Sequence, residues 1–297
     1  MKRLTGDEIA WAAQLACLYE ASIEKPGNVS PGVSFSDMRY EDFLTSAVAI
    51  GPALRDAGRA TVGETIGRAV TDTRRLVAVN TNLGLILLLA PLATAAARVP
   101  VGGGDLRAEL ATVLRALTVQ DAVLAYEAIR AAGPAGMGAS ERHDVREREV
   151  TVTLLEAMGE ARRRDAIARE YVTGFRLSFS LGAATILRCW RDGARFSEAV
   201  QMAFLTLLAE TPDTLIARKN GVTVAEDVSR HAAEVLAAGG ALNDKGRAGI
   251  RALTRELRDD THALNPGTTA DLVAASLFIA LTEGGLLGAV TALTDRW

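Results

Sequence analysis

Four short polar segments contain the residues of this sequence that are best suited to bind an anionic small molecule. The first begins at Glu24 and continues through Lys25, Gly27 and Asn28 to Asp37. Its two Pro-Gly pairs predict turns that expose backbone N–H groups, and Lys25 adds a positive charge. The segment therefore fits a phosphate-binding loop, and it fits a plain connection between two helices equally well.

The second segment, Asn80-Thr81-Asn82-Leu83-Gly84, stands directly before the most apolar stretch of the chain. Three amide or hydroxyl side chains that lead into a buried helix all need hydrogen-bond partners. An N-cap accounts for one of them, Thr81 or Asn82, and leaves the others unexplained. Because a helix N-terminus attracts anions, we predict a binding function for this segment.

The third segment places Asp213 after a proline, with Arg218 and Lys219 about one helical turn further on and Gly221 behind them. Asp213 can cap a helix or bind a metal ion. Cations near the end of a short capped helix are also favoured by the helix dipole alone. A binding role and a purely structural role therefore both remain open here.

In the fourth segment, a Pro-Gly turn after Asn265 brings Thr268, Thr269 and Asp271 to the start of a helix. Hydroxyl groups and free N–H groups suit a phosphate, and Asp271 suits Mg²⁺ or a ribose hydroxyl. The alternative is ordinary capping by Thr268 or Thr269 with an acid in the first turn. We favour the binding role for this segment.

Several carboxylates fall inside apolar helical patterns or at predicted helix starts, where an unpaired charge is costly. Together they would suit Mg²⁺, which takes a few carboxylates along with substrate phosphates, whereas any one alone is typical of a surface charge. They are Glu20, Glu64, Asp121, Asp144, Glu170, Asp213 and Asp271. The histidines His143, His231 and His262 show no metal-ligand spacing, and the sequence contains no Walker, serine-hydrolase or zinc-protease motif.

Apolar residues recur at helical spacing along the whole chain, and the four polar segments lie between the predicted helices. No alternating run indicates a strand. We predict an all-α fold, a single compact multi-helix domain over residues 1–297 with more than ten helices. Two long helices are expected over Arg39–Ala57 and Arg163–Arg191. The stretch Gly133–Glu149 lacks periodicity, and it fits either a surface loop or a lid over a ligand.

Composition excludes several classes of protein. A net charge of −3 argues against nucleic-acid binding. The most apolar run, near Leu83–Ala97, is too short to span a bilayer, and the N-terminal pattern is an amphipathic helix instead of a signal peptide. Cys17 and Cys189 fit core positions. We expect a cytoplasmic protein with no membrane partner, and a homodimer is compatible with so apolar a chain.

Taken together, these segments resemble the triphosphoribosyl-dephospho-CoA synthase family over most of the chain and in the same order. Glu20 with Lys25-Pro-Gly27 resembles the family's E…PKPG opening, and Asp37-Met38, Phe43 and Ser46-Ala47 resemble its DM…F…SA segment. The segment 80–84 is similar to its NTHKG motif, and 265–272 to its SPGGSADLL motif. The resemblance implies an all-helical enzyme that makes a prosthetic-group precursor.

The chain also departs from the family pattern. Asn82 and Leu83 replace the His and Lys of NTHKG, which removes one acid and one phosphate partner. The segment around Asp213 keeps only that residue, Arg218 and Gly221 of the family's region. The chain therefore resembles a divergent branch, similar to CitG-like proteins of archaea and C1-metabolising bacteria.

The resemblance implies that ATP loses adenine from its ribose C1′ and that the hydroxyl of a dephospho-CoA-like acceptor takes its place. Such an oxocarbenium-like transition state needs a carboxylate, a donor for the leaving base and Mg²⁺ for the triphosphate. The implied catalytic residues are Asp37, Glu64 and Asp213, and the implied metal ligands are these three with Asp271. The implied nucleotide-binding residues are Lys25, Gly27, Asn28, Asn80, Thr81, Asn82, Arg218, Lys219, Thr268 and Thr269.

Two other functions stay open at this point. The same fold could serve another nucleotide-dependent transferase or ligase that builds a pterin or furan carrier of C1 units. A helical scaffold without enzymatic activity would instead scatter the four polar segments over the surface. The enzymatic hypothesis requires that the segments around 25–37, 80–84, 213–221 and 265–271 meet in one pocket.

Overall fold

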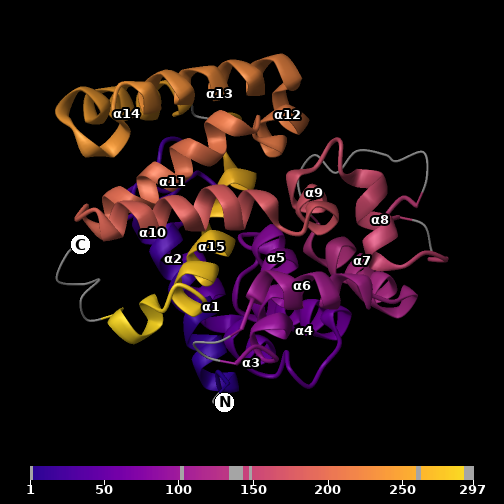
Figure 1. The fold of residues 1–297 in the computed structure, drawn as a ribbon. Helices are drawn as coiled ribbons and strands as arrows, with labels where there is room; N and C mark the ends of the chain where they lie inside the picture. The colour runs from indigo at the N-terminus through magenta and orange to yellow at the C-terminus, as the bar shows by residue number, and fades with distance from the viewer. Residues whose placement is uncertain (1–2, 101–103, 134–142, 147–148, 259–261, 291–297) are drawn as a thin grey trace. The chain divides into compact units, whose positions relative to one another are not determined.

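The computed structural model describes residues 3–100, 104–133, 143–146, 149–258 and 262–290. Within these ranges the chain is helical and contains no β-sheet, only two isolated bridge pairs, so the prediction of an all-α fold with more than ten helices is confirmed (Figure 1). The chain divides into two compact units. The first comprises Met1–Cys17 and Glu41–Arg176, and the second comprises Leu18–Tyr40 and Leu177–Trp297. A single domain over 1–297 stays a prediction.

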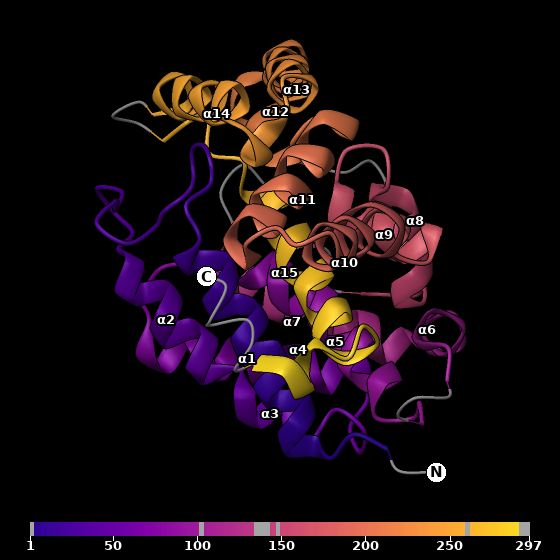
Figure 2. The ribbon, with the colours of Figure 1, turned by 60° about the vertical axis from the view of Figure 1, so that its left-hand side comes forward.

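The first unit is built around α5 (Leu83–Ala96), in which every residue except Gly84 is buried. Its helices α8 and α9 lie side by side (Figures 1 and 2). The other helices of this unit are α2 (Tyr40–Ala49), α3 (Gly51–Arg55), α4 (Val62–Leu76), α6 (Leu106–Arg115), α7 (Val119–Ala132), α8 (Leu154–Ala161) and α9 (Ala166–Thr173). Helix α1 (Gly6–Ser22) begins in this unit, and the boundary between the units falls within it, after Cys17.

Reciprocal capping boxes begin helices α1, α4, α7 and α8 of the first unit, as Thr-x-x-Glu/Asp patterns predict. At α4, Glu64 accepts a hydrogen bond from the backbone N–H of Thr61. At α7, Asp121 caps its own helix and also accepts from the N–H of Gly63 at 2.7 Å. A Cβ on Gly63 would lie 2.6 Å from the Asp121 Cα, so glycine permits this close approach of α4 and α7. Burial raises the pKa of Asp121, but these hydrogen bonds outweigh burial and lower it.

The second unit is centred on α15 (Gly267–Thr282), whose residues are buried apart from Gly267, Asp271 and Thr282. A Cβ on Gly182 would lie 1.9 Å from the Ser276 Oγ, so the π-helix η1 (Ser178–Ala183) can approach α15 only with glycine there. Helices α13 and α14 lie side by side in this unit (Figure 1). The remaining elements are α10 (Ala184–Arg191), α11 (Phe196–Glu210), α12 (Thr214–Asn220), α13 (Val222–Ala237), α14 (Asp244–Leu257) and the short helices η2 (Gly240–Leu242) and η3 (Leu286–Ala289).

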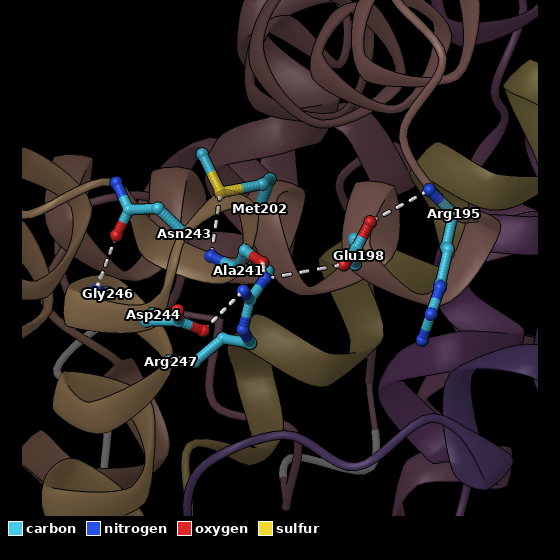
Figure 3. Close-up of polar contacts among 8 residues, drawn as sticks. All are labelled: Arg195, Glu198, Met202, Ala241, Asn243, Asp244, Gly246 and Arg247. Atoms are coloured by element: carbon cyan, nitrogen blue, oxygen red, sulfur yellow. Dashed lines mark hydrogen bonds and ion pairs between the residues drawn. The ribbon is translucent and has the colours of Figure 1, made fainter.

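Arg247 fastens the start of α14 to its neighbours in the second unit (Figure 3). Its guanidinium donates to the Ala241 carbonyl at 2.9 Å and to the Asp244 carboxylate at 2.7 Å. It also lies 3.6 Å from the carboxylate of Glu198 on α11. Asn243 caps α14 through the N–H of Gly246. These contacts connect the turn through η2 to α11 and to the start of α14.

Two predicted helices were wrong in their extent. The stretch expected as one helix over Arg39–Ala57 breaks at Ile50, because Pro52, in the first turn of α3, has no N–H to continue the α2 hydrogen-bond ladder. The stretch expected over Arg163–Arg191 ends at Gly174, which has a φ of 60°, a left-handed conformation that terminates α9. Most of the non-periodic stretch Gly133–Glu149 lies outside the described residues.

Candidate active site

The two Pro-Gly turns of the first and fourth polar segments pack against each other in the second unit. The Asn28 amide donates to the Asn265 side-chain oxygen at 3.0 Å across 237 residues of sequence. A Cβ on Gly27 would lie 2.8 Å from the Pro266 ring and 3.0 Å from the Leu257 Cβ. These two segments therefore meet, as the enzymatic hypothesis requires.

The side-chain oxygen of Asn28 is unusual in its surroundings. This oxygen is buried and has no hydrogen-bond partner among the described residues. A buried carbonyl oxygen without a donor costs about 1–3 kcal/mol, so such an atom calls for an explanation. A ligand N–H or O–H that reaches between the two turns would supply the missing donor, which supports the binding role predicted for Asn28.

Replacing Gly27 by alanine is expected to separate the two turns and lower the free energy of unfolding by about 3 kcal/mol. The new methyl group would overlap Pro266, and the φ of 77° already disfavours any L side chain. Gly32→Ala is the matched control, because Gly32 has the same φ of 77° and a Cβ added there would meet nothing within 4 Å. Urea unfolding should show a cost of only about 1 kcal/mol for Gly32→Ala. Equal costs would contradict the packing argument.

Lys25 is buried, although the sequence predicted that it contacts phosphate. Its side chain is 0% exposed, and its ammonium lies 3.0 Å from the Glu20 carboxylate. The same ammonium donates to the carbonyl of Glu20 and, at 2.9 Å, to that of Ile23. Since an ammonium has three N–H donors, all are taken. The structure gives Lys25 the role of closing the C-terminal end of α1 and shaping the turn at Gly27.

Asp213 joins two helix N-termini and is 2% exposed. One oxygen accepts from the N–H groups of Leu215 and Ile216 at the start of α12. The other accepts from the N–H and hydroxyl of Thr269 in the first turn of α15, at 2.7 and 2.8 Å. Four donors fill the acceptor sites of an ionised carboxylate. Burial raises the pKa of Asp213, and the hydrogen bonds from Thr269, Ile216 and Leu215 oppose that rise.

This arrangement changes the expected role of Asp213. A carboxylate whose two oxygens are both occupied is not free to bind a metal ion or take a proton from a substrate. The third and fourth polar segments nevertheless meet through it. The Thr214 hydroxyl also donates to that of Thr268 at 3.1 Å. Three of the four predicted segments therefore come together in the second unit.

A further contact, missed in the sequence, involves His262. Its ring stacks on Phe35 with centroids 3.8 Å apart, and its Nε2 accepts from the backbone N–H of Ser36 at 3.2 Å. The Lys219 ammonium donates to the His262 carbonyl at 3.4 Å. His262 has a φ of 51°, which is uncommon outside glycine. No local pattern marks this residue, because its stacking partner lies in the first polar segment, far away in the sequence.

Of the charged residues predicted for the site, Asp37 and Lys219 are exposed in this region. Asp37 follows Ser36 in a turn closed by the N–H of Phe35 and the carbonyl of Met38. Arg218 and Asp271 are partly exposed, on α12 and α15. These four residues remain candidates for contact with a charged substrate.

Glu64 and the segment 80–84, both predicted to belong to the site, lie in the first unit. Glu64 is exposed and is held by the capping box with Thr61, which is the structural alternative for an acid in this position. The segment 80–84 opens α5, where Asn80 accepts from the Leu83 N–H at 3.1 Å and Asn82 donates to the Thr73 hydroxyl at 3.2 Å. Thr81 lies 2.6 Å from the Ser46 hydroxyl.

The residues present fit the predicted Mg²⁺ site only in part. Among the described residues, no group of three or more Asp, Glu, His or Cys side chains could hold a metal ion. Asp213 does not fit as a ligand, because both of its oxygens accept hydrogen bonds that begin helices. Glu64 fits poorly, because one of its oxygens is engaged in capping α4. Asp37 and Asp271 fit better, since Mg²⁺ often takes one or two carboxylates with substrate phosphates and water.

The chain is similar to known proteins over most of its length. The family model of ATP:dephospho-CoA triphosphoribosyl transferase, CitG, matches residues 6–288. A crystal structure from Archaeoglobus fulgidus, provisionally assigned as a triphosphoribosyl-dephospho-CoA synthase, is similar with a TM-score of 0.63 and 29% sequence identity, over 81% of this chain and 99% of that one. No curated protein matches the chain. None of the described helices is long and apolar enough to cross a membrane. Because the family match spans nearly the whole sequence, the chain belongs to the CitG family of triphosphoribosyl transferases.

Proposed function

We propose that this enzyme transfers the triphosphoribosyl group of ATP to a hydroxyl of dephospho-CoA and releases adenine. The observation that carries the proposal is the meeting of the family's PKPG-like and SPGG-like turns at Asn28 and Asn265, beside the Asp213 segment. In the reaction, the acceptor oxygen forms a bond to C1′ as the bond from C1′ to adenine N9 breaks. The acceptor proton goes to a base, and adenine leaves with a proton.

The contacts of the predicted site residues favour different roles from those that the sequence suggested. Asp37 is the best base or charge-stabilising carboxylate, because it is exposed, whereas Asp213 is fully hydrogen-bonded and Glu64 caps a helix. Asp37 and Asp271 would hold Mg²⁺, which would neutralise charge on the triphosphate. Lys219 and Arg218 are the cations placed to meet phosphoryl oxygens. The buried Asn28 oxygen would accept a hydrogen bond from a base or ribose donor.

The test is to incubate the enzyme with ATP, Mg²⁺ and dephospho-CoA and to measure free adenine by chromatography and the product by mass. Adenine should appear in equal amounts with a dephospho-CoA derivative that has gained a triphosphoribosyl group. Release of ADP, AMP or phosphate without adenine would instead favour another nucleotide-dependent transferase or ligase. EDTA should abolish the reaction if Mg²⁺ is required. Homodimer formation and a cytoplasmic location stay predictions from the sequence.

A further inference from the structure

A small polar pocket in the first unit is not explained by the contacts described so far. It lies between the C-terminal half of α4, the segment before α5 and the end of α7. Thr73 and Arg74 line it from α4, and Asn80 and Asn82 line it from the segment before α5. Among the described residues, no carboxylate lines it. We propose that this pocket is a binding site for a phosphoryl group, with Arg74 as its cation.

The size of the pocket fits such a group. Its cavity volume is about 40 Å³. A single water needs about 10–15 Å³ on the same measure, so the pocket has room for about three water-sized groups. A tetrahedral phosphate is of this size, whereas a nucleobase or a whole ribose is larger.

The charge around the pocket also favours an anion. Arg74 uses one N–H to bond the Ala131 carbonyl, which covers an oxygen at the end of α7 that would otherwise repel an anion. The guanidinium has four further N–H donors, and no described residue accepts from them. Leu83, the first residue of α5, lines the pocket, so the positive end of a fourteen-residue helix lies beside it.

Backbone and side-chain hydrogen-bond donors near the pocket also favour an anion. In the first turn of α5, the N–H of Leu83 donates to Asn80, while those of Gly84 and Leu85 have no acceptor among the described residues. Asn82 is only 6% exposed, and only one atom of its amide, bonded to Thr73, has a partner in the described structure. The Thr73 hydroxyl can donate as well as accept, so the amide can turn and direct its N–H groups into the pocket.

The pocket coincides with the two positions where this chain departs from the NTHKG-like motif. Asn82 and Leu83 both line it, and Leu83 is buried and apolar where the motif has a lysine. Arg74 lines the same space from a different helix. The structure therefore provides a cation at this pocket without the motif's lysine. This inference concerns binding within the first unit, and it holds whether or not the proposed reaction is correct.

The test uses inorganic phosphate as the probe, at constant ionic strength, with affinity measured by calorimetry. In the wild-type enzyme the backbone amide resonance of Gly84 should shift as phosphate is added. Arg74→Gln should weaken phosphate binding about tenfold or more, because it removes charge-assisted hydrogen bonds. Arg75→Gln is the matched control, since Arg75 is the next residue but pairs with Asp72 and does not line the pocket. It should change the affinity by less than about twofold.

A second pair of variants keeps Arg74 in place. Ala78 is exposed and lines the pocket, so Ala78→Glu puts a negative charge there with little effect on folding. Ala78→Gln has nearly the same shape without the charge. We expect phosphate to bind Ala78→Glu at least about fivefold more weakly than Ala78→Gln. An unchanged Gly84 resonance, or equal affinities for the two variants, would overturn the proposal.

A separate experiment with ATP distinguishes a phosphate of the nucleotide from a free anion as the occupant of the pocket. If the pocket holds a phosphate of the nucleotide, Ala78→Glu will raise the KM for ATP in the adenine-release assay relative to Ala78→Gln. If the pocket holds a free anion, the KM values will match while phosphate affinities differ. Because phosphate binding is measured without turnover, failure of the proposed reaction and failure of this site give different results.

Discussion

Replacing Asp213 by asparagine is expected to lower the free energy of unfolding by about 2–6 kcal/mol. The amide has only one acceptor oxygen. Its NH₂ group must therefore face either the N–H groups that begin α12 or the N–H and hydroxyl of Thr269. Two buried donors then lose their acceptor, and each loss costs about 1–3 kcal/mol. Urea unfolding monitored by circular dichroism gives the measurement.

Asp105→Asn is the control for this prediction. Asp105 is also an N-cap, but it is exposed and accepts one hydrogen bond, from the N–H of Ala108. Asparagine is as good an N-cap as aspartate, so this change should cost less than about 0.5 kcal/mol. If the two substitutions cost the same, Asp213 is an ordinary cap, and its link between α12 and α15 contributes little to stability.

Lys25→Met should also destabilise the enzyme, by about 3–5 kcal/mol. The methionine fills a similar volume, but the Glu20 carboxylate is then buried without its cation, and the carbonyls of Glu20 and Ile23 lose a donor. The adjoining turn at Gly27 should shift with it. Adenine release should therefore fall, even though Lys25 is not in contact with solvent or available to a substrate.

A double-mutant cycle separates the ion pair from general damage to the core. Glu20→Gln in the Lys25→Met background removes the unpaired charge and should recover at least about 1 kcal/mol of the loss. Lys245→Met, an exposed lysine on α14, should change stability by less than about 0.5 kcal/mol. If Glu20→Gln adds its full cost to that of Lys25→Met, the two residues do not act as a pair.

The sequence pointed to four polar segments, of which three meet in the second unit, but it did not specify the role of each residue within them. Thr61 with Glu64 shows why, since a capping box and a catalytic acid at a helix start give the same local pattern. Asp213 was ambiguous for the same reason, because its decisive partner, Thr269, lies 56 residues away. Only tertiary structure shows which donors already occupy a carboxylate.

Helix positions were the most predictable feature. In α11 (Phe196–Glu210), buried residues such as Val200, Phe204 and Leu208 recur at helical spacing, and such spacing depends only on neighbours within a few residues. The breaks at Ile50 and Gly174 carry local signals, which are Pro52 in the first case and the glycine itself in the second.

The amino-acid sequence by itself determined the helical fold class, most of the helices and the motifs that mark the CitG family, because these follow from local spacing and residue type. Tertiary structure alone decided that Lys25 is buried against Glu20, that Asp213 links α12 to α15, and that His262 stacks on Phe35. The physical reason is that the free energy of a charged or polar side chain depends on its burial and its partners. Those partners come from distant parts of the chain, which no local pattern specifies.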